Sequence, residues 1–108
     1  MAVTVVIKRV LKEEKMSTQL SSLIVKLRSL AMIQPGFING QTFSCLDCKG
    51  EYLVISNWYT LEDWNKWMHS QERQDFQRRI DELTGEKTVY RYYEPVIGGI
   101  SPKFNESS

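Results

Sequence analysis

The sequence lacks a strong charge of either sign and lacks long apolar runs. Its 108 residues carry 14 Lys and Arg against 13 Asp and Glu, which gives a formal net charge of +1. A surface this close to neutral has no field for holding nucleic acid or an anionic membrane. No stretch approaches the roughly 18 apolar residues that a membrane-spanning helix needs. We therefore expect neither nucleic-acid nor membrane partners.

Cysteine and histidine are also scarce, with two Cys and one His. The first residues have no basic region typical of an export signal, so we expect a cytoplasmic protein with reduced thiols. Cys45 and Cys48 form a C-x-x-C pair, but a structural zinc site needs two further ligands and no second pair exists. The redox form of this motif lies at a helix N-terminus, whereas this pair straddles a strand and its turn. We expect two unrelated thiols and no metal site.

Hydrophobic spacing predicts strands and helices in a definite order. Apolar residues alternate in four segments, which is typical of β-strands: 2–11, 38–46, 51–58 and 87–94. Between Met16 and Ala31 they recur every three or four residues, which indicates an amphipathic helix that ends before Pro35. A second helix begins after the N-cap Thr60, and a second cap at Ser70 predicts a break before it resumes over 71–83.

The order strand-helix-strand-strand-helix-strand predicts an α+β, ferredoxin-like βαββαβ fold. Two helical regions would cover one face of a four-stranded antiparallel sheet. The other face would present Val6 and Val10, with Tyr or Phe from other strands, as the kind of apolar surface that marks an interface. We therefore expect a homodimer that joins two sheets face to face. The domain is predicted to span 1–95, and 96–108 is predicted to be a C-terminal tail.

A group of arginines and a group of tyrosines both have structural interpretations that do not involve catalysis. Arg73, Arg78 and Arg79 are expected to form the solvated face of the second helix. Tyr90, Tyr92 and Tyr93 on the last strand offer their phenol groups to either face of the sheet, and at a dimer interface we expect them to be packing residues with a polar tip.

The segment 57–69 concentrates the residues that suit a binding site. Asn57 and Trp58 end the third strand, and Trp64, Trp67 and the single histidine, His69, follow on the next helix. Packing alone is an equal explanation for Trp64, whose spacing fits a buried stripe. Trp58 and Trp67 are stronger candidates for the walls of a pocket. Asn57 could instead cap a turn, and His69 could be a solvated residue.

These residues resemble the antibiotic biosynthesis monooxygenase family. The matching motifs are Asn57-Trp58-Tyr59, Leu61-Glu62-Asp63-Trp64, Trp67-Met68-His69-Ser70, the step Ser70-Gln71-Glu72-Arg73 and the turn Pro35-Gly36-Phe37. The resemblance covers 3–94. It implies a dimeric α/β barrel in which each subunit has one pocket between its helices and its sheet.

Some members of that family oxidise phenols or quinols with molecular oxygen and without a metal or flavin. The resemblance therefore implies a cofactor-independent monooxygenase that acts on a small aromatic or quinol substrate. In this interpretation Asn57 holds a substrate oxygen, and His69 serves as a base because its ordinary pKa lies near neutrality. Trp58, Trp64 and Trp67 would bind the aromatic ligand.

Two alternatives stay open at this point. One is a non-catalytic ligand-binding or regulatory module, because fold does not fix function. The other is a haem-binding or haem-degrading protein, as in another branch of the family. That branch has a Trp nine residues after the strand-end Trp, as Trp67 follows Trp58, but its ligating His corresponds here to Gln77 and its first-strand Asn to Lys8. These two differences disfavour haem.

Overall fold

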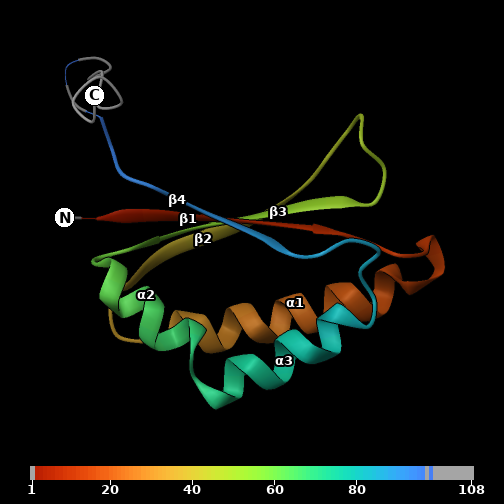
Figure 1. Cartoon of the computed structure of the whole chain (residues 1–108), viewed down its shortest axis with the longest axis horizontal. Helices are drawn as coiled ribbons and strands as arrows, with labels where there is room; N and C mark the ends of the chain where they lie inside the picture. Colours follow the sequence, from red (N-terminus) through yellow and green to blue (C-terminus); the bar gives the residue numbers. More distant parts are fainter. Residues whose placement is uncertain (1, 97, 99–108) are drawn as a thin grey trace, which may run out of the picture.

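The computed structural model describes residues 2–96 and 98, and it confirms the predicted α+β fold. Four strands form one antiparallel sheet in the order β2-β3-β1-β4, and the helices lie together on one side of it (Figure 1). The elements are β1 (Val3–Val10), a 3-10 turn (Glu14–Met16), α1 (Ser17–Met32), β2 (Phe37–Ser44), β3 (Glu51–Trp58), α2 (Leu61–Met68), α3 (Gln71–Asp81) and β4 (Val89–Tyr93). Among the described residues, no helix has the length and hydropathy needed to cross a membrane. Of the predicted tail, 96–108, only Val96 and Gly98 lie within the described residues.

The central strand β1 has one face buried by the helices and one face that the helices leave open. Val3, Val5 and Ile7 point to the covered face and are buried, whereas Val6 and Val10 alternate with them and are half-buried. The register pairs Val5 with Ser56 and Val6 with Ile55, so β3 divides its side chains between the same two faces. We call these the covered face and the open face of the sheet.

The predicted break in the second helical region lies at Ser70. The Thr60 side chain accepts a hydrogen bond from the Asp63 backbone N–H, which begins α2. The Ser70 hydroxyl accepts one from the Arg73 backbone N–H, which begins α3. Each cap satisfies a backbone donor at a helix start that would otherwise lack a partner. The break turns α3 back along α1, and it places both helices over the covered face (Figure 1).

Gly36 brings the end of α1 close to the start of α2. Its φ of 87° is in the left-handed region that favours glycine, and a Cβ at this position would overlap the Asp63 carboxylate. The Gly36 carbonyl accepts a hydrogen bond of 2.7 Å from the Tyr59 backbone N–H. Phe37, the next residue, packs edge-on against Trp58 with 5.3 Å between ring centroids. The Pro-Gly-Phe turn therefore fixes the end of β3 and its tryptophan.

Candidate functional site

A cavity of about 50 Å³ lies between the helices and the covered face of the sheet. The lining residues that matter below are Arg9, Arg28, Ser56, Trp58, Trp64, Trp67 and Arg73. Arg28 of α1 and residues of the edge strand β2 line one end of the cavity, and Arg28 is exposed, so the cavity opens between α1 and β2. Across this opening, Arg28 Nη2 donates a hydrogen bond of 2.8 Å to the Gly40 carbonyl. The space holds a few water molecules, whereas pockets for drug-sized ligands measure roughly 300–1,000 Å³.

The structure brings together the three tryptophans that were predicted to bind a ligand. Trp58, Trp64 and Trp67 all line the cavity and are 1%, 1% and 3% exposed. Trp58 and Trp64 pack edge to face with their centroids 5.6 Å apart. Their burial in the core is also what packing alone predicts, so each ring is at once a core residue and part of the cavity wall.

The polar lining near the tryptophans is Ser56. The Trp58 indole Nε1 donates a hydrogen bond of 3.0 Å to the Ser56 hydroxyl, and both groups are buried. This contact satisfies the indole N–H and leaves the Ser56 O–H to donate to a further acceptor.

Arg9 is the most unusual residue of the cavity, and it was not anticipated from the sequence. It continues the alternation of Val3, Val5 and Ile7, so its side chain enters the core and is 1% exposed. Arg9 Nη2 donates to the Gln77 amide oxygen at 2.9 Å, but Arg9 Nε has no hydrogen-bond partner among the described residues. Burial, followed by the nearby Arg73 guanidinium, lowers the Arg9 pKa to about 10. Burial of a charged group with an unmet donor is costly and is typical of a site that expects a ligand.

Arg73 also lies inside, which corrects the expectation of a solvated arginine. It is 1% exposed, and its guanidinium carbon lies 5.2 Å from the Trp64 ring centroid and 5.4 Å from that of Tyr90. Arg73 Nη2 also donates to the Tyr90 hydroxyl at 3.3 Å. The aromatic faces stabilise the cation by cation–π attraction, and this allows an arginine to occupy a core position. Arg78 and Arg79 are exposed, as expected.

The two buried guanidinium groups have neutral hydrogen-bond partners. Gln77 links them, since its amide oxygen accepts from Arg9 and also from the Tyr90 hydroxyl at 3.2 Å. Among the described residues, the ion pairs of Lys or Arg with Asp or Glu include neither Arg9 nor Arg73. Asp81, which accepts a hydrogen bond from the Gln77 amide at 2.7 Å, offsets part of the Arg9 charge from a distance. Among the described residues no carboxylate contacts either guanidinium directly, so the cavity between the two cations favours an anion.

The structure places Asn57 away from this cavity. Its side chain lies on the open face, where the carbonyl oxygen accepts from the Thr4 hydroxyl at 2.5 Å and the amide donates to Asn39 at 2.7 Å. The sheet separates it from the tryptophans. Its predicted role in holding a substrate oxygen stays a prediction, and this placement does not bring it to the cavity.

His69 lies at the exposed C-terminal end of α2. Its Nδ1 is 2.8 Å from the Asn65 carbonyl oxygen, which is a local contact at a helix end. It does not line the cavity, although the neighbouring Trp67 does. Its predicted role as a base likewise stays a prediction.

The sequence contained a signal for both buried arginines. Arg9 follows the period of two in β1, and Arg73 lies three residues before Phe76 and seven before Ile80, on the inner stripe of α3. An arginine on an apolar stripe is usually interpreted as a solvated end of that stripe, because its long stem can reach water. For Arg9 and Arg73, the spacing with apolar residues predicts burial better than the residue type does.

Comparison with known proteins supports this architecture. The family model described as antibiotic biosynthesis monooxygenase matches residues 2–79. No curated protein sequence matches the chain.

Solved structures share the fold at low sequence identity. SnoaB, a cofactor-independent oxygenase from Streptomyces nogalater, superposes with a TM-score of 0.77 at 13% identity, over 91% of this chain and 98% of that one. A conserved protein from Methanosarcina mazei gives 0.80 at 15% identity, over 86% and 91%. A protein from Mycobacterium tuberculosis gives 0.79 at 12% identity, over 89% and 98%. Because the family model covers most of the chain, the protein belongs to the antibiotic biosynthesis monooxygenase family.

Proposed function

We propose that the protein is a cofactor-independent monooxygenase that oxidises a small aromatic substrate, bound as its phenolate in the tryptophan-lined cavity. The observation that carries the proposal is the pair of buried guanidinium groups, Arg9 and Arg73, which have no carboxylate ion pair among the described residues. A phenolate oxygen would supply a negative charge in direct contact, which neither group has from a carboxylate of the described residues. The Arg9 Nε–H, which has no partner, is the donor available to it.

The reaction that fits this site uses the electrons of the substrate. A ring C–H of the phenolate becomes C=O, one oxygen atom of O₂ enters the ring, and the other leaves as water with two hydrogens of the phenol. Deprotonation makes the ring electron-rich enough to reduce oxygen. Arg9 and Arg73 would favour the phenolate by stabilising its charge in a site shielded from water. Trp58, Trp64 and Trp67 would hold the ring.

Substrate entry requires the cavity to widen. Its volume of about 50 Å³ is smaller than an aromatic ring system needs. The opening lies between α1 and β2, where the contact from Arg28 to the Gly40 carbonyl crosses it on the exposed side. Breaking one exposed hydrogen bond has a modest cost, of about 1 kcal/mol. We propose that α1 and β2 part at this point to admit the ring.

Oxygen consumption with simple naphthols and hydroquinones tests the proposal. We expect consumption in air and no product without oxygen. Arg9→Met should lower kcat by about 10²–10³-fold, the usual cost of losing an oxyanion donor. The fold should tolerate the change, because an apolar side chain of similar length replaces an incompletely paired buried charge.

Matched variants make this test decisive. Arg78→Met changes an exposed arginine on the same helix as Arg73 and should leave turnover as it is. Arg9→Lys keeps the charge but loses the fork of donors, so its turnover should lie between that of the wild type and that of Arg9→Met. Turnover that continues anaerobically, or an Arg9→Met variant as active as the wild type, would overturn the proposal.

A second candidate function is a non-catalytic module that binds a small anion or aromatic acid. The specific observation in its favour is the small volume of the cavity, about 50 Å³, which three buried tryptophans help to wall. Quenching of tryptophan fluorescence by an aromatic carboxylate, without oxygen consumption by any phenol, would favour this function. Loss of that quenching in Arg9→Met would locate the ligand at the same place.

Haem does not fit the residues at the corresponding positions. Gln77 replaces the ligating histidine, and its amide nitrogen donates to Asp81 at 2.7 Å and to Thr88 at 3.1 Å while its oxygen accepts from Arg9. Lys8 lies on the open face, with its Nζ 4.0 Å from Glu51. Neither residue offers the interaction that its counterpart supplies to haem, so these positions do not suit haem.

We further propose that the protein acts as a cytoplasmic homodimer joined through the open face. Phe43 and Tyr93 on this face are 42% and 52% exposed, and Val6 and Ile55 lie between them half-buried. A second copy of the same sheet would cover these apolar side chains.

A further inference from the structure

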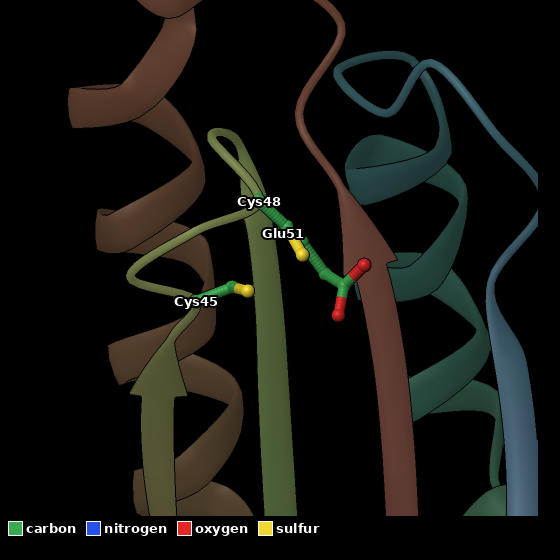
Figure 2. A group of neighbouring side chains, drawn as sticks. All are labelled: Cys45, Cys48 and Glu51. Atoms are coloured by element: carbon green, nitrogen blue, oxygen red, sulfur yellow. The ribbon is translucent and has the colours of Figure 1, made fainter.

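A cluster of metal-ligand side chains lies at the turn between β2 and β3, apart from the tryptophan-lined cavity (Figure 2). The Sγ atoms of Cys45 and Cys48 and a carboxylate oxygen of Glu51 all lie within 4.8 Å of one another. Both cysteines are free thiols. Figure 2 shows Cys45 at the end of β2, Cys48 in the turn and Glu51 at the start of β3, with the three side chains extending to one side of the hairpin.

The hairpin backbone holds these positions in register. The Cys45 N–H donates to the Glu51 carbonyl at 2.9 Å, and the Glu51 N–H donates to the Cys48 carbonyl at 3.1 Å. Gly50 has a φ of 85°, a left-handed conformation that lets the chain reverse between Cys48 and Glu51. The ligand atoms therefore come from a closed turn whose backbone does not have to move for them to meet.

The charges around the two sulfurs suit a cation. Asp47 Oδ1 accepts from the Cys45 thiol at 3.2 Å and from the Cys48 thiol at 3.6 Å. The Asp47 carboxylate, the Glu51 carboxylate and the two thiols thus lie together at this turn, and a bound cation would be attracted to all of them.

We propose that Cys45, Cys48 and Glu51 form a binding site for Zn²⁺. Zinc is bound tetrahedrally by thiolate and carboxylate, with Zn–S about 2.3 Å and Zn–O about 2.0–2.2 Å. Two sulfurs on one such ion are about 3.8 Å apart, so the three ligands have to close by no more than about 1 Å. Rotation about side-chain bonds supplies that distance. Calcium and magnesium take oxygen ligands and do not suit two thiols.

The fourth coordination position is open to water or to a further ligand. Solvent reaches the site directly, because Cys48 is exposed and Cys45 is partly exposed. Binding replaces the thiol protons, which pass to solvent, and needs no oxidant. Lys8, 4.0 Å from Glu51, would offset part of the negative charge of two thiolates and a carboxylate around a dication. The C-x-x-C pair, which from the sequence alone lacked further ligands, therefore gains one from across the hairpin.

Cobalt substitution of the full-length reduced protein tests the site. With one equivalent of Co²⁺ under anaerobic conditions, we expect a thiolate-to-cobalt charge-transfer band in the near ultraviolet and intense visible bands of tetrahedral cobalt. Zn²⁺ should abolish these bands. It should also protect both thiols from alkylation.

Single substitutions assign the ligands. Cys45→Ser and Cys48→Ser should each weaken Zn²⁺ affinity by about tenfold or more, and Glu51→Gln should weaken it less, since the two thiolates remain. Glu62→Gln, at an exposed position of α2, is the matched control and should leave affinity unchanged. Circular dichroism would show that each variant is folded.

Three results would overturn the proposal. The first is the absence of a charge-transfer band with Co²⁺. The second is zinc affinity that stays the same in both cysteine variants, which would indicate adventitious binding elsewhere. The third is a Cys45–Cys48 disulfide that persists in excess reductant, because disulfide sulfurs are not thiolate ligands. None of these outcomes bears on oxygen consumption, so the experiments test this site and the proposed monooxygenase activity independently.

Discussion

The two faces of the sheet follow the same alternation but differ in what they bury. On the covered face, Val3, Val5 and Ile7 build the core and Arg9 continues their row as a buried cation. On the open face, Val6 lies among half-exposed apolar and polar side chains. The period of two decides which face a side chain occupies, whereas the elements packed against that face decide whether a polar group can remain there.

The helices explain how the covered face accommodates charge. Arg73 reaches the aromatic faces of Trp64 and Tyr90, and Arg9 reaches the amide of Gln77. Within residues 2–96, no helix lies over the open face (Figure 1). The covered face therefore carries a candidate reaction site, and the open face carries the features of a contact surface.

The largest expected effect on stability comes from removing a large side chain from the covered face. Trp58 and Tyr59 are consecutive, yet Trp58 is 1% exposed and Tyr59 is 64% exposed. Trp58→Ala should lower the free energy of unfolding by about 3–5 kcal/mol, because it leaves a large cavity in the core. Tyr59→Ala should change it by about 0.5 kcal/mol or less.

Urea denaturation of the two variants measures this difference. Similar losses in both would mean that the covered face is not the core of the folded protein. If Trp58→Ala loses only a little free energy of unfolding, then water or neighbouring side chains fill the space. In that case the cavity beside it is more adaptable than its volume suggests.

The fold was predictable from the sequence because its signals are local. Strand alternation, helical spacing and the caps Thr60 and Ser70 each act within a few residues, and all agree with the observed elements. The candidate site was only partly predictable. The tryptophan wall was anticipated, but Arg9 meets Gln77 across 68 positions of the chain, and no local pattern announces that contact.

The cluster of Cys45, Cys48 and Glu51 was not predictable from the sequence for the same reason, because it depends on a contact across the hairpin. Glu51 is an ordinary strand residue in the sequence, and it meets Cys45 only because the hairpin places the two opposite each other. Arg73 was placed wrongly because its residue type outweighed its position on the stripe of Ile80. Long-range partners, rather than propensities, decide these functional positions.

A second prediction concerns the open face as a dimer interface. Ile55→Glu puts a charge among the apolar side chains of this face, next to Val6 in the register. If two copies join there, the charge should weaken dimerisation by about tenfold or more, since burial of an unpaired carboxylate is costly. Sedimentation equilibrium over a range of concentrations measures the change.

The matched control is Ile33→Glu, at a position 77% exposed beyond the end of α1 and away from the open face. It should leave the association constant unchanged. A wild-type protein that stays monomeric at high micromolar concentration would contradict the proposed dimer. So would an Ile55→Glu variant that associates as tightly as the wild type.

The smallest expected effects come from Asn57 and His69, which lie outside the cavity. Asn57→Ala removes hydrogen bonds to Thr4 and Asn39 on the open face and should cost about 1 kcal/mol of stability. His69→Ala removes a contact at an exposed helix end and should change stability by about 0.5 kcal/mol or less. Because neither residue lines the cavity, turnover should change by about twofold or less in both variants, which corresponds to about 0.5 kcal/mol.

Oxygen consumption at several pH values separates this outcome from a catalytic role. If His69 were the base, His69→Ala would lower kcat and change the shape of the pH profile. If Asn57 held the substrate oxygen, Asn57→Ala would lower kcat as strongly as Arg9→Met while the fold stayed intact. Either result would move the reaction site from the covered face towards the open face or the end of α2. It would also leave the two buried guanidinium groups with a structural role, held by Gln77, Trp64 and Tyr90.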